Sequence, residues 1–120
     1  MITGGHDLPN PYVIHCLGPV YGEDAREDAR EDEILARCYK NALMLADEGR
    51  LDSVAFPSIS TGVFGYPMKE AARVALKTIL AVAPTLRSVK PIRMVLFRPA
   101  DLKIHEDVLR ELAETALLSR

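Results

Sequence analysis

The sequence has the size and composition of one small globular domain. Its 120 residues, 48% hydrophobic and 27% charged, are too few for two domains and too apolar for a disordered chain. The formal net charge of −2 argues against general nucleic-acid binding, which needs a basic face. No apolar run approaches the length of a membrane span and the first residues lack a signal-peptide layout, so we expect a cytoplasmic protein with no membrane partner.

The first half of the chain predicts a strand and then a helix. Glycines and prolines in residues 1–11 indicate a turn-rich lead-in. Residues 12–17 are β-branched or aromatic and predict a short buried strand. The repeated acidic and basic residues 23–33 are typical of a solvated helix start, with an acidic binding patch as the alternative. The helix that follows is expected to end at Gly49 and to bury one face made of Ile34, Cys38, Ala42 and Leu45.

The second half repeats this alternation. Residues 53–57 predict a second strand, and residues 92–97 a third. Between them a helix ends before Pro84 and buries a face made of Ala71, Ala72, Ala75, Ile79 and Val82. Asp101 is expected to be the N-cap of a last helix, which would bury Ile104, Val108, Leu112 and Ala116. Alternating strands and helices predict an α/β fold with a parallel sheet, whose ligand lies at the carboxyl ends of the strands.

The loop of residues 58–67 connects a predicted strand to a predicted helix and has the chemistry of an anion site. Gly62 and Gly65 allow the backbone to turn sharply and approach a ligand. Pro67 suits the first turn of a helix whose free N–H groups favour an anion. The hydroxyl groups of Ser58, Ser60 and Thr61 are further candidate donors. On pattern alone, an ordinary strand-to-helix turn stays open as the alternative.

Other reactive side chains are scattered rather than clustered. Cys16 and Cys38 have neither disulfide nor metal-ligand spacing and are expected to be buried, reduced thiols. His6, His15 and His105 form no catalytic triad order and no metal motif, and His15 is interpreted as structural. The sequence therefore predicts no metal site, no cofactor and no assigned catalytic residue.

Two motifs give the chain a family resemblance. The string SISTGVFGYP at residues 58–67 resembles the phosphate-binding loop of macrodomains, the ADP-ribose-1''-phosphate processing family. Upstream, Leu8-Pro9, then residues 12–15, then Gly18-Pro19 match the strand signature L-P-x-x-Y-V-I-H-x-x-G-P of the same family. The resemblance covers nearly the whole chain. It implies a three-layer α/β sheet with helices on both faces, here without the N-terminal strands and first helix, so that residues 1–120 form a single truncated macrodomain.

The resemblance also implies a ligand and its contacts. Family members bind ADP-ribose or a derivative, and the amides around Ser60 to Phe64 would hold the pyrophosphate. Phe64 matches the aromatic that packs on the distal ribose, and Phe97 matches the aromatic on which adenine stacks. The ligand-binding residues implied in this way are Ser58, Ser60, Thr61, Gly62, Val63, Phe64, Gly65 and Phe97.

This sequence also departs from the family pattern. It has neither the N-A-A-N strand end nor the glycine-rich loop with which hydrolysing members process phosphate, acetyl or protein adducts at the distal ribose. Catalytic residues therefore stay unassigned. We expect the exposed sheet to make the chain a homo-oligomer or to bind a chain that supplies the missing half. The alternative is a non-catalytic structural or assembly protein. A different nucleotide-binding doubly wound fold would show G-x-G-x-x-G, which is absent.

Overall fold

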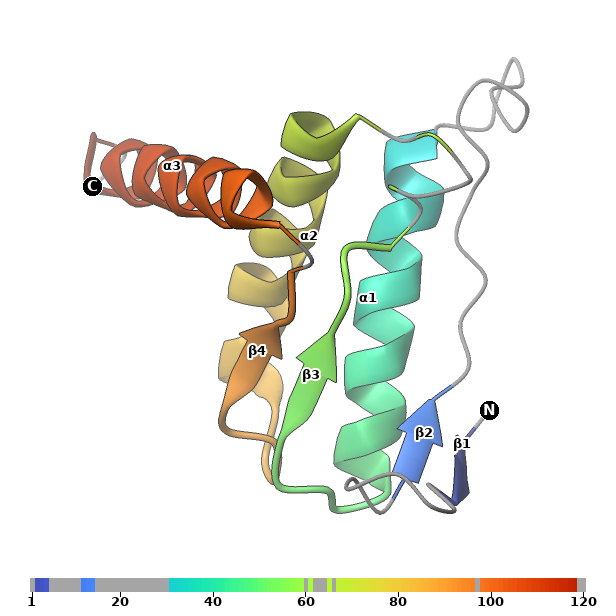
Figure 1. Cartoon of the computed structure of the whole chain (residues 1–120). Coiled ribbons are helices and arrows are strands. Elements are labelled where there is room, and N and C mark those ends of the chain that lie inside the picture. Colours follow the sequence, from blue (N-terminus) through green and yellow to red (C-terminus); the bar gives the residue numbers. More distant parts are fainter. Residues whose placement is uncertain are drawn as a thin grey trace.

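The computed structural model describes residues 2–4, 12–14, 31–59, 61, 65, 67–96 and 98–118. Strands and helices alternate along most of this chain (Figure 1). The elements, in order, are β1 (Ile2–Gly4), β2 (Tyr12–Ile14), α1 (Glu31–Glu48), β3 (Val54–Phe56), α2 (Met68–Val82), the 3-10 turn η1 (Ala83–Thr85), β4 (Ile92–Met94) and α3 (Pro99–Leu118). Some sequence predictions lie outside the described residues, namely those for residues 23–30, Cys16, His6 and His15.

The strands β3 and β4 form the predicted parallel pair. Val54 pairs with Ile92 and Phe56 with Met94, and the chain passes from one strand to the other through α2. The N–H of Val54 donates to the Pro91 carbonyl at 3.1 Å, and the N–H of Val95 donates to the Phe56 carbonyl at 2.7 Å. These bonds extend the ladder at both ends.

A second, antiparallel pair corrects the prediction for the N-terminus. Residues 1–11 were expected to be a turn-rich lead-in, but Ile2–Gly4 form β1, which pairs with β2 so that Ile2 lies opposite Ile14. A three-residue strand that ends in glycine has almost no local signal, because its stability comes from the partner strand. The predicted strand over residues 12–17 is present as β2, Tyr12–Ile14.

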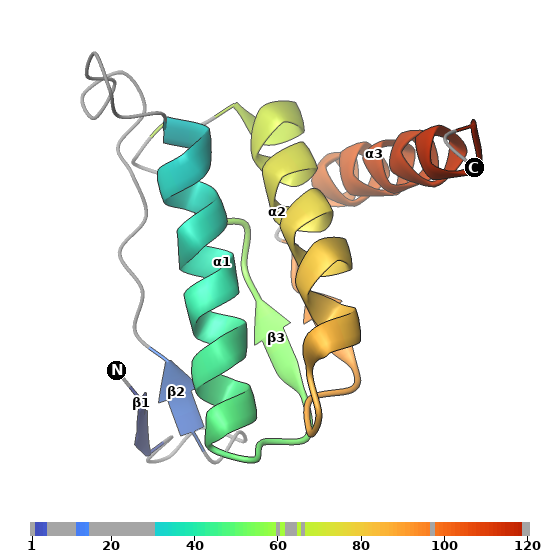
Figure 2. The same cartoon turned by 180° about the vertical axis from the view of Figure 1, so that it is seen from behind.

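The helices α1 and α2 lie side by side against one face of β3–β4 (Figures 1 and 2). Along β3, Phe56 is buried beneath them whereas Ala55 is exposed on the opposite face, as the alternation of strand side chains requires. All five residues predicted for the buried face of α2 are buried. The buried core consists of Leu35, Tyr39, Ala42, Leu43, Ala46, Phe56, Ala71, Ala75, Ile79, Val82, Leu86 and Val89.

The buried face of α1 differs from the prediction. The helix buries Leu35, Tyr39, Ala42, Leu43 and Ala46. Of the four predicted residues only Ala42 is fully buried, and the other three are half-buried at the edge of this face. Cys38 is one of these three, a half-buried thiol rather than a buried one. The helix carries apolar side chains over a wide arc, so periodicity alone did not determine which side faces the core.

The helix α1 ends at Glu48, directly before the predicted stop at Gly49, but the left-handed residue that follows the helix is not the glycine. Arg50, not Gly49, has the left-handed backbone, with φ of 59°. The N–H of Leu51 donates to the Ala46 carbonyl at 2.9 Å, and the N–H of Arg50 donates to the Asp47 carbonyl at 3.0 Å. This pair of bonds is a Schellman motif, which satisfies carbonyl groups that the end of a helix would leave without partners.

A carboxylate near the end of α1 fastens the segment that leads into β4. Asp47 accepts hydrogen bonds from the N–H groups of Ser88 at 2.8 Å, Arg87 at 2.9 Å and Val89 at 3.2 Å. The Ser88 hydroxyl donates to the same carboxylate at 3.0 Å. These donors, with the N–H of Ser88 first and that of Arg87 second, lower the pKa of Asp47 from 3.8 to about 2. We call this set of contacts the Asp47 staple.

The last helix, α3, starts where β4 ends and crosses α2 before it runs away from the sheet (Figures 1 and 2). Glu111 of α3 meets Arg73 of α2 at 3.1 Å and Lys69 at 4.0 Å. The helix buries Asp101, His105 and Val108. None of the helices in the described ranges is long and apolar enough to span a bilayer.

The start of α3 corrects the expectation that Asp101 is an N-cap. The Arg98 carbonyl accepts from the N–H groups of Asp101 at 3.0 Å and Leu102 at 3.2 Å, so the helix begins directly after Arg98. Pro99 takes its first position, where a missing N–H costs nothing. Asp101 therefore lies inside the first turn, and its carboxylate is turned to Arg98.

Candidate functional site

The candidate site lies at the carboxyl edge of β3–β4. Because the two strands are parallel and in register, the chain after Phe56 and the chain after Met94 leave the sheet at the same edge (Figure 1). The bond from the Val95 N–H to the Phe56 carbonyl keeps the two exits together. Pro57 starts the loop predicted to bind an anion, and Arg98 starts the approach to α3. Open parallel sheets bind ligands at this edge.

A buried tyrosine fixes the beginning of the loop. The side chain of Tyr39, on α1, is 0% exposed and its ring meets that of Phe56 edge-on, with centroids 5.0 Å apart. Its hydroxyl donates to the Pro57 carbonyl at 3.4 Å and accepts from the Ile59 N–H at 3.1 Å. One hydroxyl therefore satisfies two backbone groups just after β3, and the loop starts from a rigid point.

Two loop hydroxyls make bonds within the protein. The Thr61 hydroxyl donates to the Ser58 carbonyl at 2.8 Å, and the Ser58 hydroxyl donates to the Met68 sulfur at 3.4 Å. The first bond closes the turn over residues 58–61, and the second ties the loop to the start of α2. In the structure these two hydroxyls shape the loop, and the expectation that they donate to a phosphate stays a prediction. The assignment of Ser58 and Thr61 to the ligand site stays a prediction.

Gly65 and Pro67 are the described residues of the loop just before α2. Gly65 has φ of +76°, and a Cβ added there would meet nothing within 4 Å, so glycine is needed for its backbone conformation rather than for space. Pro67 is the N-cap residue of α2, one position before the helix, and provides no side-chain cap. The first N–H groups of α2 thus carry the partial positive charge that favours an anion.

The predicted ligand residues are only partly within the described chain. Ser58, Thr61 and Gly65 lie in the segment that connects β3 to α2, and their contacts with a ligand stay predictions. Ser60, Gly62, Val63, Phe64 and Phe97 lie outside the described residues, so their roles stay predictions. Among the side chains that the structure does describe, no three His, Cys, Asp or Glu residues are grouped to hold a metal ion.

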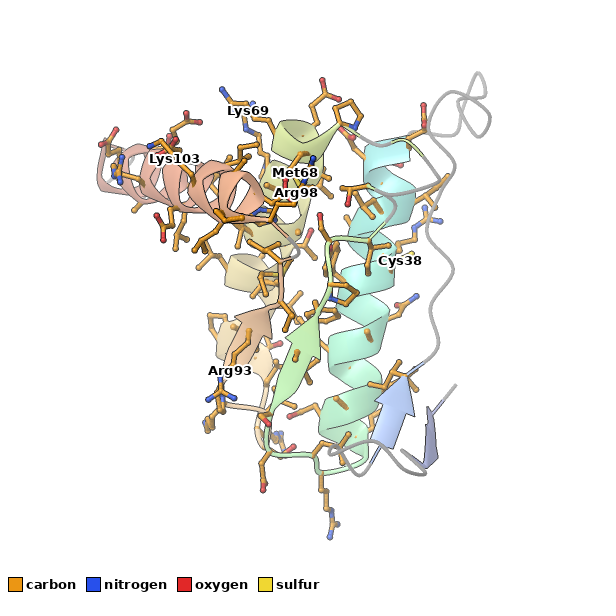
Figure 3. The ribbon with its side chains drawn as sticks, in the orientation of Figure 1. Cys38, Met68, Lys69, Arg93, Arg98 and Lys103 are labelled. Carbon is orange, nitrogen blue, oxygen red and sulfur yellow. The ribbon has the colours of Figure 1, made fainter. Side chains whose placement is uncertain are left out.

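An ion pair that was not predicted from the sequence lies beside this edge. The Arg98 guanidinium donates to Asp101 from Nη2 at 3.0 Å and from Nε at 3.2 Å. The Asp101 side chain is 5% exposed and that of Arg98 is 66% exposed. Figure 3 labels Arg98 near the start of α3. Hydrogen bonding to Asp101, and then its charge, raise the pKa of Arg98 above its ordinary value. The three-residue spacing, at which side chains meet on a helical turn, was the available signal.

His105 lies one turn further along α3 and is also buried. Its Nδ1 is 2.8 Å from the Asp101 carbonyl, and because a carbonyl only accepts, Nδ1 carries the hydrogen in this bond. Its buried Nε2 has no hydrogen-bond partner among the residues that the structure describes. The arrangement supports the start of α3 and gives His105 a structural position.

Comparison with known proteins identifies the class to which this fold and loop belong. The family model of the Macro domain matches residues 1–75. The chain belongs to the macro domain family, as the motifs at residues 8–19 and 58–67 predicted. The α/β fold that the resemblance implied is confirmed by solved macrodomain structures. One of these, the Oceanobacillus iheyensis macrodomain with ADP, superposes with a TM-score of 0.88 at 41% identity, over 96% of this chain and 58% of the other.

Two curated relatives illustrate the range of the family. The Macro domain-containing protein CT2219 of Chlorobaculum tepidum is 39% identical over 90% of this chain and 61% of its own. The human ADP-ribose glycohydrolase MACROD2 is 42% identical over 92% of this chain and 26% of its own. The chain thus spans about three fifths of the length of the bacterial relative.

Proposed function

We propose that this chain binds ADP-ribose or a derivative, with the diphosphate in the loop of residues 58–66. The observation that carries the proposal is the loop itself: it starts at a point fixed by Tyr39 and ends at Pro67, which provides no side-chain cap for α2. Such an end offers backbone N–H groups to a phosphate. The relative MACROD2 is named an ADP-ribose glycohydrolase, and the Oceanobacillus macrodomain was solved with ADP.

Calorimetry with ADP-ribose tests this proposal directly. We expect a saturable heat of binding when ADP-ribose is added to the full chain. ADP should compete with ADP-ribose for the same site. No heat at millimolar ADP-ribose would contradict the proposal and would favour the alternative of a non-catalytic structural or assembly protein.

A pair of matched threonine variants connects binding to the loop. Thr61→Val removes the hydroxyl that closes the turn with Ser58, and Thr85→Val removes a similar bond to the Val82 carbonyl, 2.7 Å long, in η1. Both substitutions keep the β-branched shape and should cost similar stability, about 1 kcal/mol. Only Thr61→Val should weaken ADP-ribose binding. Equal affinities for the two variants would contradict a ligand in the loop.

Binding without turnover is the activity we propose for these 120 residues. The reason is that they contain neither the N-A-A-N strand end nor the glycine-rich loop of the hydrolysing members. Incubation with ADP-ribose-1''-phosphate should therefore show binding but no phosphate release above the buffer rate. Sustained phosphate release by the purified chain would overturn this part of the proposal.

Association with a second copy of the chain is a separate proposal, supported by exposed apolar side chains. Leu102 and Leu109 lie two turns apart on one side of α3 and are 51% and 44% exposed, and Val95 after β4 is 61% exposed. Burial of such side chains between two copies would remove apolar surface from contact with water and so favour association. Sedimentation should show a dimer that Leu102→Lys disrupts. Leu80→Lys, at a side chain also 51% exposed, should leave it intact.

Two other outcomes of the sedimentation experiment would contradict the dimer. A monomer at all concentrations would remove association altogether. The chain could also be a monomer that forms a one-to-one complex with a separate chain containing the remainder of a macrodomain. That result would favour association with this partner instead of with a second copy.

A further inference from the structure

The sulfur of Met68 connects the two ends of the loop of residues 58–67. Met68 is the first residue of α2, and Figure 3 labels it near the start of that helix. Its Sδ accepts a hydrogen bond from the Ser58 hydroxyl at 3.4 Å. Because Ser58 lies just after β3, this contact brings the beginning of the loop to its end. A thioether therefore takes part in closing the loop.

Ser58 also holds the turn inside the loop. Its carbonyl accepts a hydrogen bond from the Thr61 hydroxyl at 2.8 Å, so the same residue links the turn over residues 58–61 to α2. Pro67 provides no side-chain cap for the helix. Among the described residues, the bond from Ser58 to the sulfur is the side-chain bond that ties this loop to α2. A chemical change at the sulfur is therefore passed to the turn.

The thioether of methionine has an oxidation chemistry that can be reversed. With hydrogen peroxide, a sulfur lone pair attacks one peroxide oxygen and the O–O bond breaks. The proton of the transferred oxygen passes to the departing hydroxide, so the products are the sulfoxide and one water. The sulfur is oxidised by two electrons and the peroxide is reduced by two. Met68 is half-buried, so part of the residue is in contact with solvent, from which a small peroxide arrives.

The contact between Ser58 and Met68 has no room for the added oxygen. A sulfoxide oxygen that faces Ser58 needs about 2.7 Å to the hydroxyl oxygen. Together with the new S–O bond, this exceeds the present 3.4 Å between Sδ and Oγ. In the other sulfoxide epimer the oxygen faces away and withdraws electron density from the sulfur, so the Ser58 hydroxyl loses its acceptor. Either epimer separates Ser58 from Met68.

We propose that Met68 is a reversible oxidation site that regulates the loop of residues 58–67. In the thioether state, the bond from Ser58 holds the loop closed against the start of α2, whose backbone N–H groups favour a phosphate. In the sulfoxide state, the loop opens and binds the diphosphate more weakly. The effect on binding rests on the proposed function, whereas the opening of the loop needs no ligand.

The test compares the full chain before and after treatment with hydrogen peroxide. Dithiothreitol is added afterwards, because it returns sulfenic acids and disulfides of cysteine to thiols and leaves methionine sulfoxide unchanged. Peptide mass spectrometry measures the sulfoxide at each methionine. We expect the affinity for ADP-ribose to fall about fivefold when Met68 is oxidised, the effect of one lost hydrogen bond. The two stereospecific methionine sulfoxide reductases should restore it.

Three variants assign the effect to one sulfur and its contact. Met68→Leu has similar volume and no sulfur, so peroxide should leave its affinity unchanged. Met44→Leu removes a methionine that is 44% exposed on α1, and its affinity should fall on oxidation as that of the wild type does. Ser58→Ala removes the hydroxyl that meets the sulfur, so its affinity should fall less on oxidation than that of the wild type.

Three results would overturn the oxidation site. One is an equal loss of affinity on oxidation in wild type and Met68→Leu. Another is an equal loss in wild type and Ser58→Ala. The third is the absence of a sulfoxide at Met68 when Met44 is fully oxidised.

Amide chemical shifts separate this inference from the proposed function. Without any ligand, oxidation should move the amide signals of Thr61 and Gly65 in the wild type but not in Met68→Leu. If these signals move but ADP-ribose does not bind, the oxidation site stands and the proposed function is wrong. If ADP-ribose binds equally before and after complete oxidation of Met68, the inference is wrong and the proposed function stands.

Discussion

Single residues define the two ends of the loop, and Tyr39 defines the first. Its hydroxyl joins the Pro57 carbonyl and the Ile59 N–H. We predict that Tyr39→Phe keeps the edge contact with Phe56 but lowers the free energy of unfolding by about 1 kcal/mol, because a backbone N–H loses its acceptor. Urea unfolding measures this. ADP-ribose binding should weaken in parallel. An unchanged unfolding midpoint would show that the Tyr39 hydroxyl does not contribute to stability.

Gly65 defines the second end of the loop. At φ of +76° with open space around its Cα, Gly65→Ala should lower stability by about 1 kcal/mol through backbone strain alone. Gly65→Asn should lose less, because asparagine tolerates the left-handed region. Thermal unfolding of the two variants compares them. If alanine and asparagine are equally destabilising, the loss comes from something other than backbone conformation.

Residue-level prediction worked where the backbone dictates the residue type and failed where a distant partner does. Gly65 was recognised from the loop pattern because few residues suit a positive φ. For Ser58 and Thr61, the sequence does not show that Met68 and a backbone carbonyl lie within reach of their hydroxyls, and their assignment to a ligand stays a prediction. Tyr39 was missed for the same reason, although its spacing from Leu35 and Leu43 indicates a shared buried face.

At the scale of elements, the Asp47 staple joins α1 to the segment before β4 and should make stability depend on pH. The pKa of the Asp47 carboxyl is lowered from 3.8 to about 2, so the folded state holds this proton less tightly than the unfolded state does. The staple therefore stabilises the fold above about pH 4 and loses this effect as the pH falls towards 2.

We predict that Asp47→Asn lowers stability at pH 7 and that its difference from wild type shrinks between pH 4 and pH 2. Urea unfolding at several pH values measures both. Asp52→Asn is the matched control, because Asp52 is exposed and contributes its backbone carbonyl, not its carboxylate, to the bond with Lys90. A difference that persists unchanged at pH 2 would show that the charge of Asp47 is not what holds the segment.

The end of α1 offers a stabilising substitution. Arg50 has φ of 59° in a Schellman motif, a position that glycine occupies without strain. We predict that Arg50→Gly raises the free energy of unfolding by about 0.5–1 kcal/mol, measured by thermal unfolding. Arg50→Ala keeps a Cβ in the same backbone and should give no gain. A gain from alanine equal to that from glycine would assign the effect to the arginine side chain.

The buried face of a helix was predictable where its apolar residues form a single stripe. In α2 a narrow stripe of alanines and branched residues has one side that can face the sheet, and all five predicted residues are buried. In α1 two neighbouring stripes are apolar, and only packing against Phe56 and α2 selects the one with Tyr39. The start of α3 was misplaced because Asp101 has N-cap chemistry, but Pro99 and the pairing of Asp101 with Arg98 fix the boundary earlier.

At the scale of the molecule, order along the chain predicted more than composition did. Alternating strands and helices predicted the parallel β3–β4 pair and the edge where the loop lies, because crossover connections place both strand ends together. The antiparallel β1–β2 pair was not predictable, since three-residue strands depend on partners distant from the local pattern. The roles given to the residues inside the loop rest on the family resemblance and stay predictions.

The crossover through α2 has a consequence for how the molecule opens. A parallel ladder cannot form until the connecting helix has brought the chain back, so β3, α2 and β4 should behave as one cooperative unit. In native-state hydrogen exchange, the amide protons of Val54, Ala75 and Val95 should show the same dependence on denaturant, while those near the far end of α3 exchange at a lower opening energy. Separate denaturant slopes for Val54 and Ala75 would mean that the sheet pair and its covering helix can come apart independently.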